Sequence, residues 1–188
     1  MSDGRLTNAL IITFLLFFAT ITVGWVGTAH NPQMGEDLMA LFQKEVAGQM
    51  NGGNTLDLWG KLLTNNLEAC ILLLLGGASF GIFTIFIMSL NGIVIGAIME
   101  IVHQDHSALF VAAAIVPHGI FEIPAFIISG ALGIMLAQSL ISEWYGGADA
   151  ALDARRYALI FLMYVIPLVA IAATVEAFIT PLVIQLVV

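Results

Sequence analysis

The feature that most constrains this chain is a histidine and a glutamate inside a long apolar segment, in the stretch 117–124, which reads PHGIFEIP. His118 and Glu122 are four residues apart, so on a helix their side chains share one face. Pro117 and Pro124 each remove a backbone hydrogen-bond donor and loosen a helix. Lipid can satisfy neither a charge nor a freed backbone group. We therefore predict a broken or kinked transmembrane helix whose polar centre faces protein or trapped water.

The composition predicts a polytopic membrane protein. Hydrophobic residues make up 60% of the 188 residues and charged residues only 10%, whereas soluble domains carry about 25% charged residues. We expect one transmembrane domain over residues 1–188, surrounded by membrane lipid. Only five Lys and Arg are present and the net charge is -8, which argues against a nucleic-acid partner. Cys70 lies in an apolar run and is interpreted as a small buried hydrophobe, and no cofactor is expected.

Apolar runs of about 20 residues predict membrane-spanning helices. The expected fold is an all-α bundle of about five spans, at residues 6–28, 67–88, 90–103, 107–141 and 156–187. The third span is short. The fourth is too long to cross as a straight helix and is expected to be broken or kinked at Pro117–Pro124, and the fifth is expected to be kinked at Pro167. A turn is placed at Ser89–Gly92 between the second and third spans. The first is expected to be retained, because its apolar core is too long for a signal peptide.

Residues 34–64 form the only extended polar region, and they predict short amphipathic helices outside the cytoplasm. Apolar residues recur there at helical spacing, interrupted near Gly52-Gly53. The expected apolar faces carry Met34, Leu38, Leu41, Phe42 and Val46 in the first helix, and Leu56, Trp59, Leu62 and Leu63 in the second. Helices that bind anionic lipid are rich in Lys and Arg. This region is acidic, so packing on protein is favoured.

The basic residues predict the orientation of the chain. Arg5 and the Arg155-Arg156 pair flank spans, and basic flanks favour the cytoplasmic side. Placing both there requires an even number of crossings between them. Four of the five predicted spans lie between Arg5 and Arg155, so this condition is met. We therefore expect a multi-pass protein of the cytoplasmic membrane, with its N-terminus in the cytoplasm and its C-terminus outside.

Several polar and glycine-containing motifs together resemble one family. They are Asn65-Asn66 before a glycine-bearing span, Asn91-Gly92 after it, and Pro117-His118-Gly119 with Glu122 and Ala125. Over residues 63–136 this pattern resembles the stage II sporulation protein M family of integral membrane proteins. The resemblance implies a five-span helical protein of the cytoplasmic membrane. Its sporulation members resemble scaffolds that anchor a peptidoglycan-remodelling complex at the engulfing membrane.

Two functions remain open from the sequence. The first is a component or scaffold of a membrane complex, as a homodimer or with other membrane proteins. In that case His118 and Glu122 would tie the bent helix to Asn65, Asn91 or Glu176, at roughly 0.6 to 2 kcal/mol per interhelical hydrogen bond. The residues expected to serve packing and this network are Asn65, Asn66, Asn91, Gly92, Pro117, Gly119 and Pro124, with Gly119 leaving room for another backbone.

The alternative function is a transporter or channel for a small cation or a proton. Discontinuous helices that carry ionisable groups are typical of ion sites in transporters. The expected intramembrane polar site consists of His118, Glu122, Glu176 and Glu100. If a metal binds, His118 and Glu122 are its predicted ligands.

The sequence does not predict an enzyme. It contains neither His-Glu-x-x-His nor Gly-x-Ser-x-Gly. The loop His103-Gln104-Asp105-His106 holds three possible metal ligands, but a fourth ligand is missing. This loop is interpreted as a solvated turn.

Overall fold

The fold is all-α, as predicted. The computed structural model describes residues 3–31, 33, 35, 37, 40, 54–147 and 149–187, and these contain no strand. The helices are α1 (Asp3–His30), α3 (Thr55–Leu75), α4 (Ile82–Asp105), α5 (Ala108–Trp144), α6 (Ala150–Ile160), α7 (Ile166–Thr174) and α8 (Thr180–Gln185). A 3-10 turn, η2 (Gly76–Ser79), follows α3, and two π-helical turns, η3 (Phe161–Val165) and η4 (Val175–Ile179), join α6 to α7 and α7 to α8.

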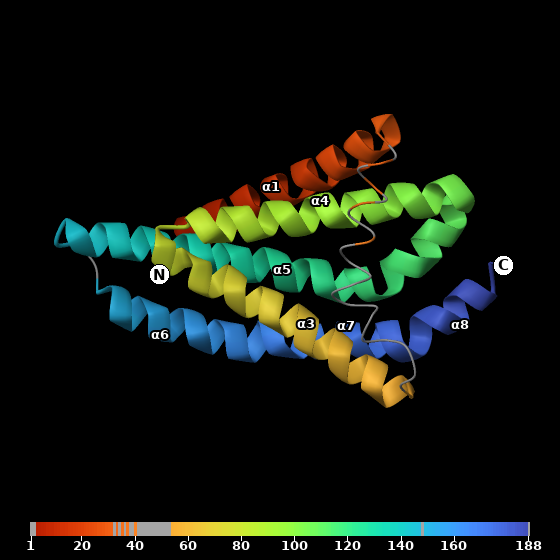
Figure 1. Ribbon diagram of the computed structural model, residues 1–188. Helices are drawn as coiled ribbons and strands as arrows, with labels where there is room; N and C mark the ends of the chain where they lie inside the picture. The colour runs from red at the N-terminus through yellow and green to blue at the C-terminus, as the bar shows by residue number, and fades with distance from the viewer. Residues whose placement is uncertain are drawn as a thin grey trace.

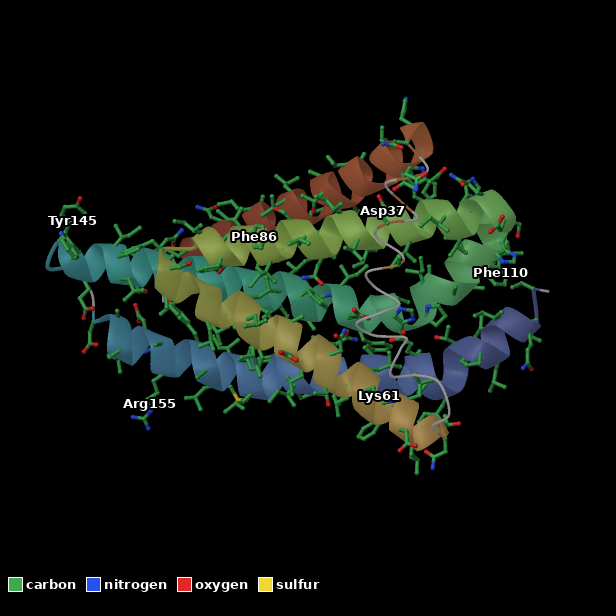
Figure 2. All side chains as sticks on the ribbon, in the orientation of Figure 1. Asp37, Lys61, Phe86, Phe110, Tyr145 and Arg155 are labelled. Carbon is green, nitrogen blue, oxygen red and sulfur yellow. The ribbon has the colours of Figure 1, made fainter. Side chains whose placement is uncertain are left out.

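Five helical segments in the described residues are long and apolar enough to cross a membrane, with α6 to α8 counted as one. This confirms the predicted five spans. Figure 1 shows them side by side as a bundle, in which α1, α4 and α6–α8 run one way and α3 and α5 the other. The N-terminus and the C-terminus consequently lie at opposite ends. Figure 2 shows Arg155 toward the end at which α1 begins, and Lys61 toward the other end.

Helix α5 is the centre of the bundle, because it contacts α1, α3, α4, α6, α7 and α8. Thr13 of α1 donates a hydrogen bond to the carbonyl oxygen of Ile127 in α5, at 3.2 Å. The largest fully buried apolar side chains are Phe17, Leu73, Met88, Leu132, Met135, Val165 and Val169. A polar group on the inner face of α5 is therefore presented to the other spans instead of to lipid.

Helices α1 and α4 pack with their backbones in close contact, and glycines make this possible. A Cβ atom added to Gly24 would overlap the carbonyl oxygen of Ile93, and one added to Gly96 would overlap that of Ile21. Gly92 lies against the same helix α1. Small residues at this spacing allow helices to approach closely in membranes, where dispersion contacts replace the hydrophobic effect. Gly92 and Gly96 thus occupy the kind of contact that their spacing predicts.

The reversal between the second and third spans lies earlier than predicted. Helix α3 ends at Leu75, and η2 leads to Phe80 and Gly81, which have the left-handed φ values of 57° and 87°. Glycine adopts this conformation without a steric penalty. Thr84 Oγ1 donates to the carbonyl oxygen of Leu73 at 2.9 Å and holds the start of α4 against the end of α3. Gly77 and Gly81 therefore belong to a reversal and not to one helix.

The turn expected at Ser89–Gly92 is wrong, and with it the spans 67–88 and 90–103. Helix α4 runs without interruption through these residues. Asn91 Nδ2 donates to the carbonyl oxygen of Ile87 at 2.8 Å, so its amide is satisfied within the helix. The third span is therefore a full helix of 24 residues instead of a short one.

The predicted second amphipathic helix is not a separate element. Its residues form the first turns of α3, which begins with a capping box at Asn54. The Asn54 side chain accepts a hydrogen bond from the Asp57 backbone N–H at 3.0 Å, and the Asn54 N–H donates to Asp57 Oδ2 at 3.1 Å. Residues 33, 35, 37 and 40 are helical, in the region of the first predicted helix. Its expected apolar face, with Met34, Leu38, Leu41, Phe42 and Val46, lies outside the described residues.

Helix α5 is kinked and not broken. It stays helical from Ala108 to Trp144, and its first part bends away from the rest in Figure 1. Pro117 and Pro124 lie within it and cannot donate to the carbonyl groups four residues earlier. The sequence prediction of a bend at Pro117–Pro124 is confirmed.

The last span is interrupted by two wide, π-helical turns. The Ile166 N–H bonds to the carbonyl oxygen of Phe161, and the Thr180 N–H to that of Val175, in two π-helical turns. Each of these turns comes just before a proline, at Pro167 and Pro181. A proline ring clashes with the carbonyl group four residues earlier, and a wider turn relieves that clash. The span also begins before residue 156, because Asp149 caps α6 at Ala150.

A buried hydroxyl joins α5 to α6. Ser139 Oγ donates to Asp153 Oδ2 at 2.8 Å and lies 3.1 Å from Tyr157 Oη. Ser139→Ala should lower the free energy of unfolding by about 1–3 kcal/mol, because it leaves a buried polar group unpaired. SDS titration in mixed micelles measures this, with Ser89→Ala on α4 as the control. Equal unfolding midpoints for the two variants would contradict the prediction.

Candidate functional site

Three ionisable side chains converge between α5 and the last span. His118 and Glu122 lie on α5 and Glu176 lies in η4, and one ligand atom from each lies within 4.8 Å of the other two. His118 Nε2 is 3.9 Å from Glu122 Oε2. Among the described residues, this is the one group of three or more His, Cys, Asp or Glu side chains close enough to hold a metal ion. We call these three residues the His-Glu-Glu cluster.

The irregular parts of two helices bring the cluster together. His118 and Glu122 are one turn apart on the kinked part of α5, between Pro117 and Pro124. Glu176 lies in the wide turn η4, which contacts α5. Single π-helical turns are rare and often occur at functional sites. The same proline chemistry that bends both helices thus positions the carboxylates.

Among the described residues, no Lys or Arg pairs with the carboxyl groups of the cluster. Within the described part of the chain, the ion pairs closer than 4 Å are His118–Glu122 and Asp153–Arg156. The side chains of His118 and Glu122 are only 16% and 17% exposed. A buried charge in a bilayer must be paired or must bind an ion or a proton, because lipid does not solvate it. Two carboxyl groups beside one imidazole therefore require a proton or a cation from outside the chain.

Three side-chain atoms are buried without a hydrogen-bond partner among the described residues: His118 Nδ1 in the cluster, Thr180 Oγ1 one turn after Glu176, and Thr28 Oγ1 in α1. Thr180 is only 6% exposed and follows Glu176 by four residues. It is not among the predicted site residues. The spacing Glu176-x-x-x-Thr180 before Pro181 is the sequence signal that could have found it, since it puts both side chains on one helix face.

Trp59 secures the position of η4. Its indole Nε1 donates to Thr174 Oγ1 at 3.0 Å, and the Thr174 hydroxyl donates to the carbonyl oxygen of Ala170 at 2.8 Å. Thr174 is the last residue of α7, directly before η4. Trp59 is predicted in a short amphipathic helix outside the cytoplasm, whereas in the structure it connects α3 to the segment that carries Glu176.

The fourth predicted site residue, Glu100, lies outside the cluster. It is buried on α4 and accepts a hydrogen bond from Gln104 Nε2 at 3.2 Å. Of the asparagines expected to tie His118 in place, Asn91 bonds within its own helix and Asn65 Nδ2 lies 3.4 Å from Asn66 Oδ1. The structure therefore brings together three of the four predicted ionisable residues.

Among the described residues, Gly119 does not pack against another helix. A Cβ atom there would meet only Ile115 and Ile123 of its own helix, at ordinary contact distances. The residue lines a shallow apolar depression formed by Ile115, Val116, Gly119, Ile120, Ile123 and Pro124. No described residue makes the backbone approach that was expected at Gly119.

His103 in the last turn of α4 and His106 directly after it do not join a metal cluster among the described residues. His103 packs against Trp25, with ring centroids 5.5 Å apart, and His106 stacks on Phe110 at 4.1 Å. Both rings make aromatic contacts at the end of the bundle. The predicted turn at 103–106 is wrong for its first three residues, which form the end of α4, and the chain leaves the helix only at His106.

A bundle of five membrane-length helices around a partly buried His-Glu-Glu cluster defines an integral membrane protein with a polar site between its spans. The sequence profile of the stage II sporulation protein M family matches residues 13–181, so the chain belongs to that family. The resemblance stated from the motifs is thereby confirmed.

Two archaeal proteins are similar over nearly the whole chain, both from Methanocaldococcus jannaschii. "Uncharacterized protein MJ0793" is 27% identical over 176 residues, which cover 92% of this chain and 93% of that protein. "Uncharacterized protein MJ0706" is 27% identical over 179 residues, covering 90% of this chain and 78% of that protein. No solved structure matches. These relatives extend the family likeness beyond the motif region.

Proposed function

We propose that this protein moves a small cation or a proton across the cytoplasmic membrane, using the interface between α5 and the last span. The observation that carries this proposal is the His-Glu-Glu cluster, in which two carboxyl groups share one imidazole and have no Lys or Arg within 4 Å among the described residues. Hydrogen bonding alone could use Asn or Gln, without the roughly 2.5 to 3.5 kcal/mol that a charge costs at the bilayer centre. The ionisable groups are therefore better explained by exchange of an ion or a proton.

The helix geometry also supports transport. Transporter sites are commonly built where helices are discontinuous, because freed backbone groups and side chains can contact an ion there. The cluster lies at a proline kink of α5 and at a π-helical turn. Both irregularities occur where the bundle carries its ionisable groups.

We further propose that the N-terminus is cytoplasmic and the C-terminus is outside. Arg5 lies at the start of α1, and Arg155 and Arg156 lie in α6, toward the same end of the bundle. The excess of basic residues at one end supports a cytoplasmic location for that end. Lys61, toward the other end, is an exception, and Lys44, between α1 and α3 in the sequence, is a second one in this orientation.

Flux measurements in liposomes test the proposed transport. Purified protein should carry protons or divalent cations down a gradient, and Glu122→Gln should reduce this flux by at least about tenfold, since it removes one ionisable group from the cluster. Glu100→Gln is the matched control, because Glu100 is buried outside the cluster. Equal flux in wild type and Glu122→Gln would contradict the proposal.

The second candidate is a component of a membrane complex. It is favoured by the position of the cluster, which joins the central helix α5 to the last span. With bound protons, the same three side chains could hold these helices together by hydrogen bonds. Complete absence of flux from folded wild-type protein would favour this function over transport.

A further inference from the structure

The ligand set of the His-Glu-Glu cluster indicates which class of ion it takes. This inference rests on the proposed function but concerns binding and not movement. The candidate ligands come from two neighbouring segments, His118 and Glu122 from α5 and Glu176 from η4. A site shared between two segments can change its occupancy when they move relative to each other.

The size of the cluster fits a metal ion. The centre of a triangle with 4.8 Å sides is about 2.8 Å from each corner, so the ligands need to close in by only about 0.7 Å to reach bonds of roughly 2.0–2.2 Å. The distance from His118 Nε2 to Glu122 Oε2 is 3.9 Å, which is already shorter than the 4.8 Å side of that triangle. Rotation of long glutamate side chains covers such a difference.

The chemistry of the ligands favours a first-row transition metal over a hard cation. An imidazole nitrogen suits Zn²⁺, Fe²⁺, Ni²⁺ and Cu²⁺, whereas Mg²⁺ and Ca²⁺ prefer oxygen ligands. Ca²⁺ takes six to eight oxygens, and the two carboxylates supply at most four. A divalent ion would also balance the charge of two carboxylates, which no Lys or Arg within 4 Å balances among the described residues.

A second observation points to a ligand at this place. Thr180 is 6% exposed, and its hydroxyl has no hydrogen-bond partner in the described part of the chain. It lies one turn beyond Glu176, in a helix that contacts α5. His118 Nδ1 is also buried without a partner among the described residues. Buried polar atoms are almost always satisfied, so an ion or its bound water would account for the Thr180 hydroxyl, and a water would account for His118 Nδ1.

We propose that His118, Glu122 and Glu176 bind one divalent first-row transition-metal ion, and that the Thr180 hydroxyl completes the site directly or through a bound water. The two carboxylates and the neutral imidazole form the ligand set. Thr180 positions the ion or its water from the same helix face as Glu176.

Titration with Co²⁺ tests this proposal in purified protein stripped with EDTA. Co²⁺ is the probe because its visible absorption changes when nitrogen and oxygen ligands replace water. One ion per chain should bind, and Zn²⁺ should displace it while Ca²⁺ should not. This competition uses the wild-type protein, so it does not depend on how well any variant folds.

Variants then assign the ligands. His118→Gln and Glu176→Gln should each weaken Co²⁺ binding by more than roughly 100-fold, the upper range seen for outer-shell partners of metal sites. Thr180→Val should weaken it by about tenfold, while Glu100→Gln should leave it unchanged. Absence of Co²⁺ binding, displacement by Ca²⁺ as readily as by Zn²⁺, or an equal loss in Glu100→Gln would overturn the proposal.

The two proposals fail in different ways. Ion or proton flux in liposomes without Co²⁺ binding would retain transport and overturn the metal site. Co²⁺ binding with the expected variant pattern but without flux would support the metal site and overturn transport.

Discussion

Gly96→Ala is expected to lower the free energy of unfolding by about 1–3 kcal/mol, the usual range for overpacking. The added Cβ atom would overlap the carbonyl oxygen of Ile21 and approach the backbone nitrogen of Trp25. Neither is the end of a flexible side chain, so relief requires α1 and α4 to move apart. That movement would also loosen the neighbouring contact of Gly24 with Ile93.

Gly60→Ala is the matched control for this prediction. Gly60 lies in α3 and has no atom within 4 Å of an added Cβ. The same chemical change there should be neutral or stabilising, because alanine favours a helix by about 1 kcal/mol over glycine. SDS titration in mixed micelles, followed by tryptophan fluorescence, compares the two variants. A Gly96→Ala protein as stable as Gly60→Ala would show that the α1–α4 contact is less close than described.

The effect of Glu122→Gln on the free energy of unfolding is expected to have opposite signs without metal and with saturating Zn²⁺. In EDTA at alkaline pH, which favours ionised carboxylates, the variant should be more stable than wild type by up to about 3 kcal/mol. This is the scale of burying one charge at the bilayer centre. The reason is that Glu122 and Glu176 belong to one cluster, with no Lys or Arg within 4 Å in the described residues.

Saturating Zn²⁺ should invert this order. A ligand at 1,000 times its dissociation constant stabilises the folded protein by about 4.1 kcal/mol, which exceeds the advantage of the variant in EDTA, and the variant should gain much less because one ligand is missing. Glu100→Gln serves as the control and should behave as wild type in both conditions. If Glu122→Gln were less stable than wild type with and without Zn²⁺, the carboxyl group would be a structural hydrogen-bonding group and not an ion ligand.

Much of the fold could be predicted from the sequence, because a bilayer sets a length for each apolar helix. Hydropathy was sufficient to predict the number of spans. The two prolines in an apolar run too long for one straight crossing were sufficient to predict the bend in α5. The proximity of His118 and Glu122 follows from helix periodicity alone, since residues four apart share a face.

Local signals failed where tertiary contacts offered an alternative. Asn91-Gly92 predicted a turn, yet α4 continues through it, because the Asn91 amide finds an acceptor one turn earlier and Gly92 packs against α1. The reversal instead uses Phe80 and Gly81, whose left-handed conformation the sequence did not distinguish from the other glycine positions.

The sequence by itself determined that this is a five-span helical protein with ionisable groups inside the membrane, because hydropathy and helix periodicity act over neighbouring residues. Only the tertiary structure decided which of these groups meet. Glu176 joins His118 and Glu122. Glu100 instead accepts a hydrogen bond from Gln104 within its own helix, α4. Thr180 likewise becomes a candidate ligand only through packing. Such contacts depend on how distant helices bend and pack, which no local pattern specifies.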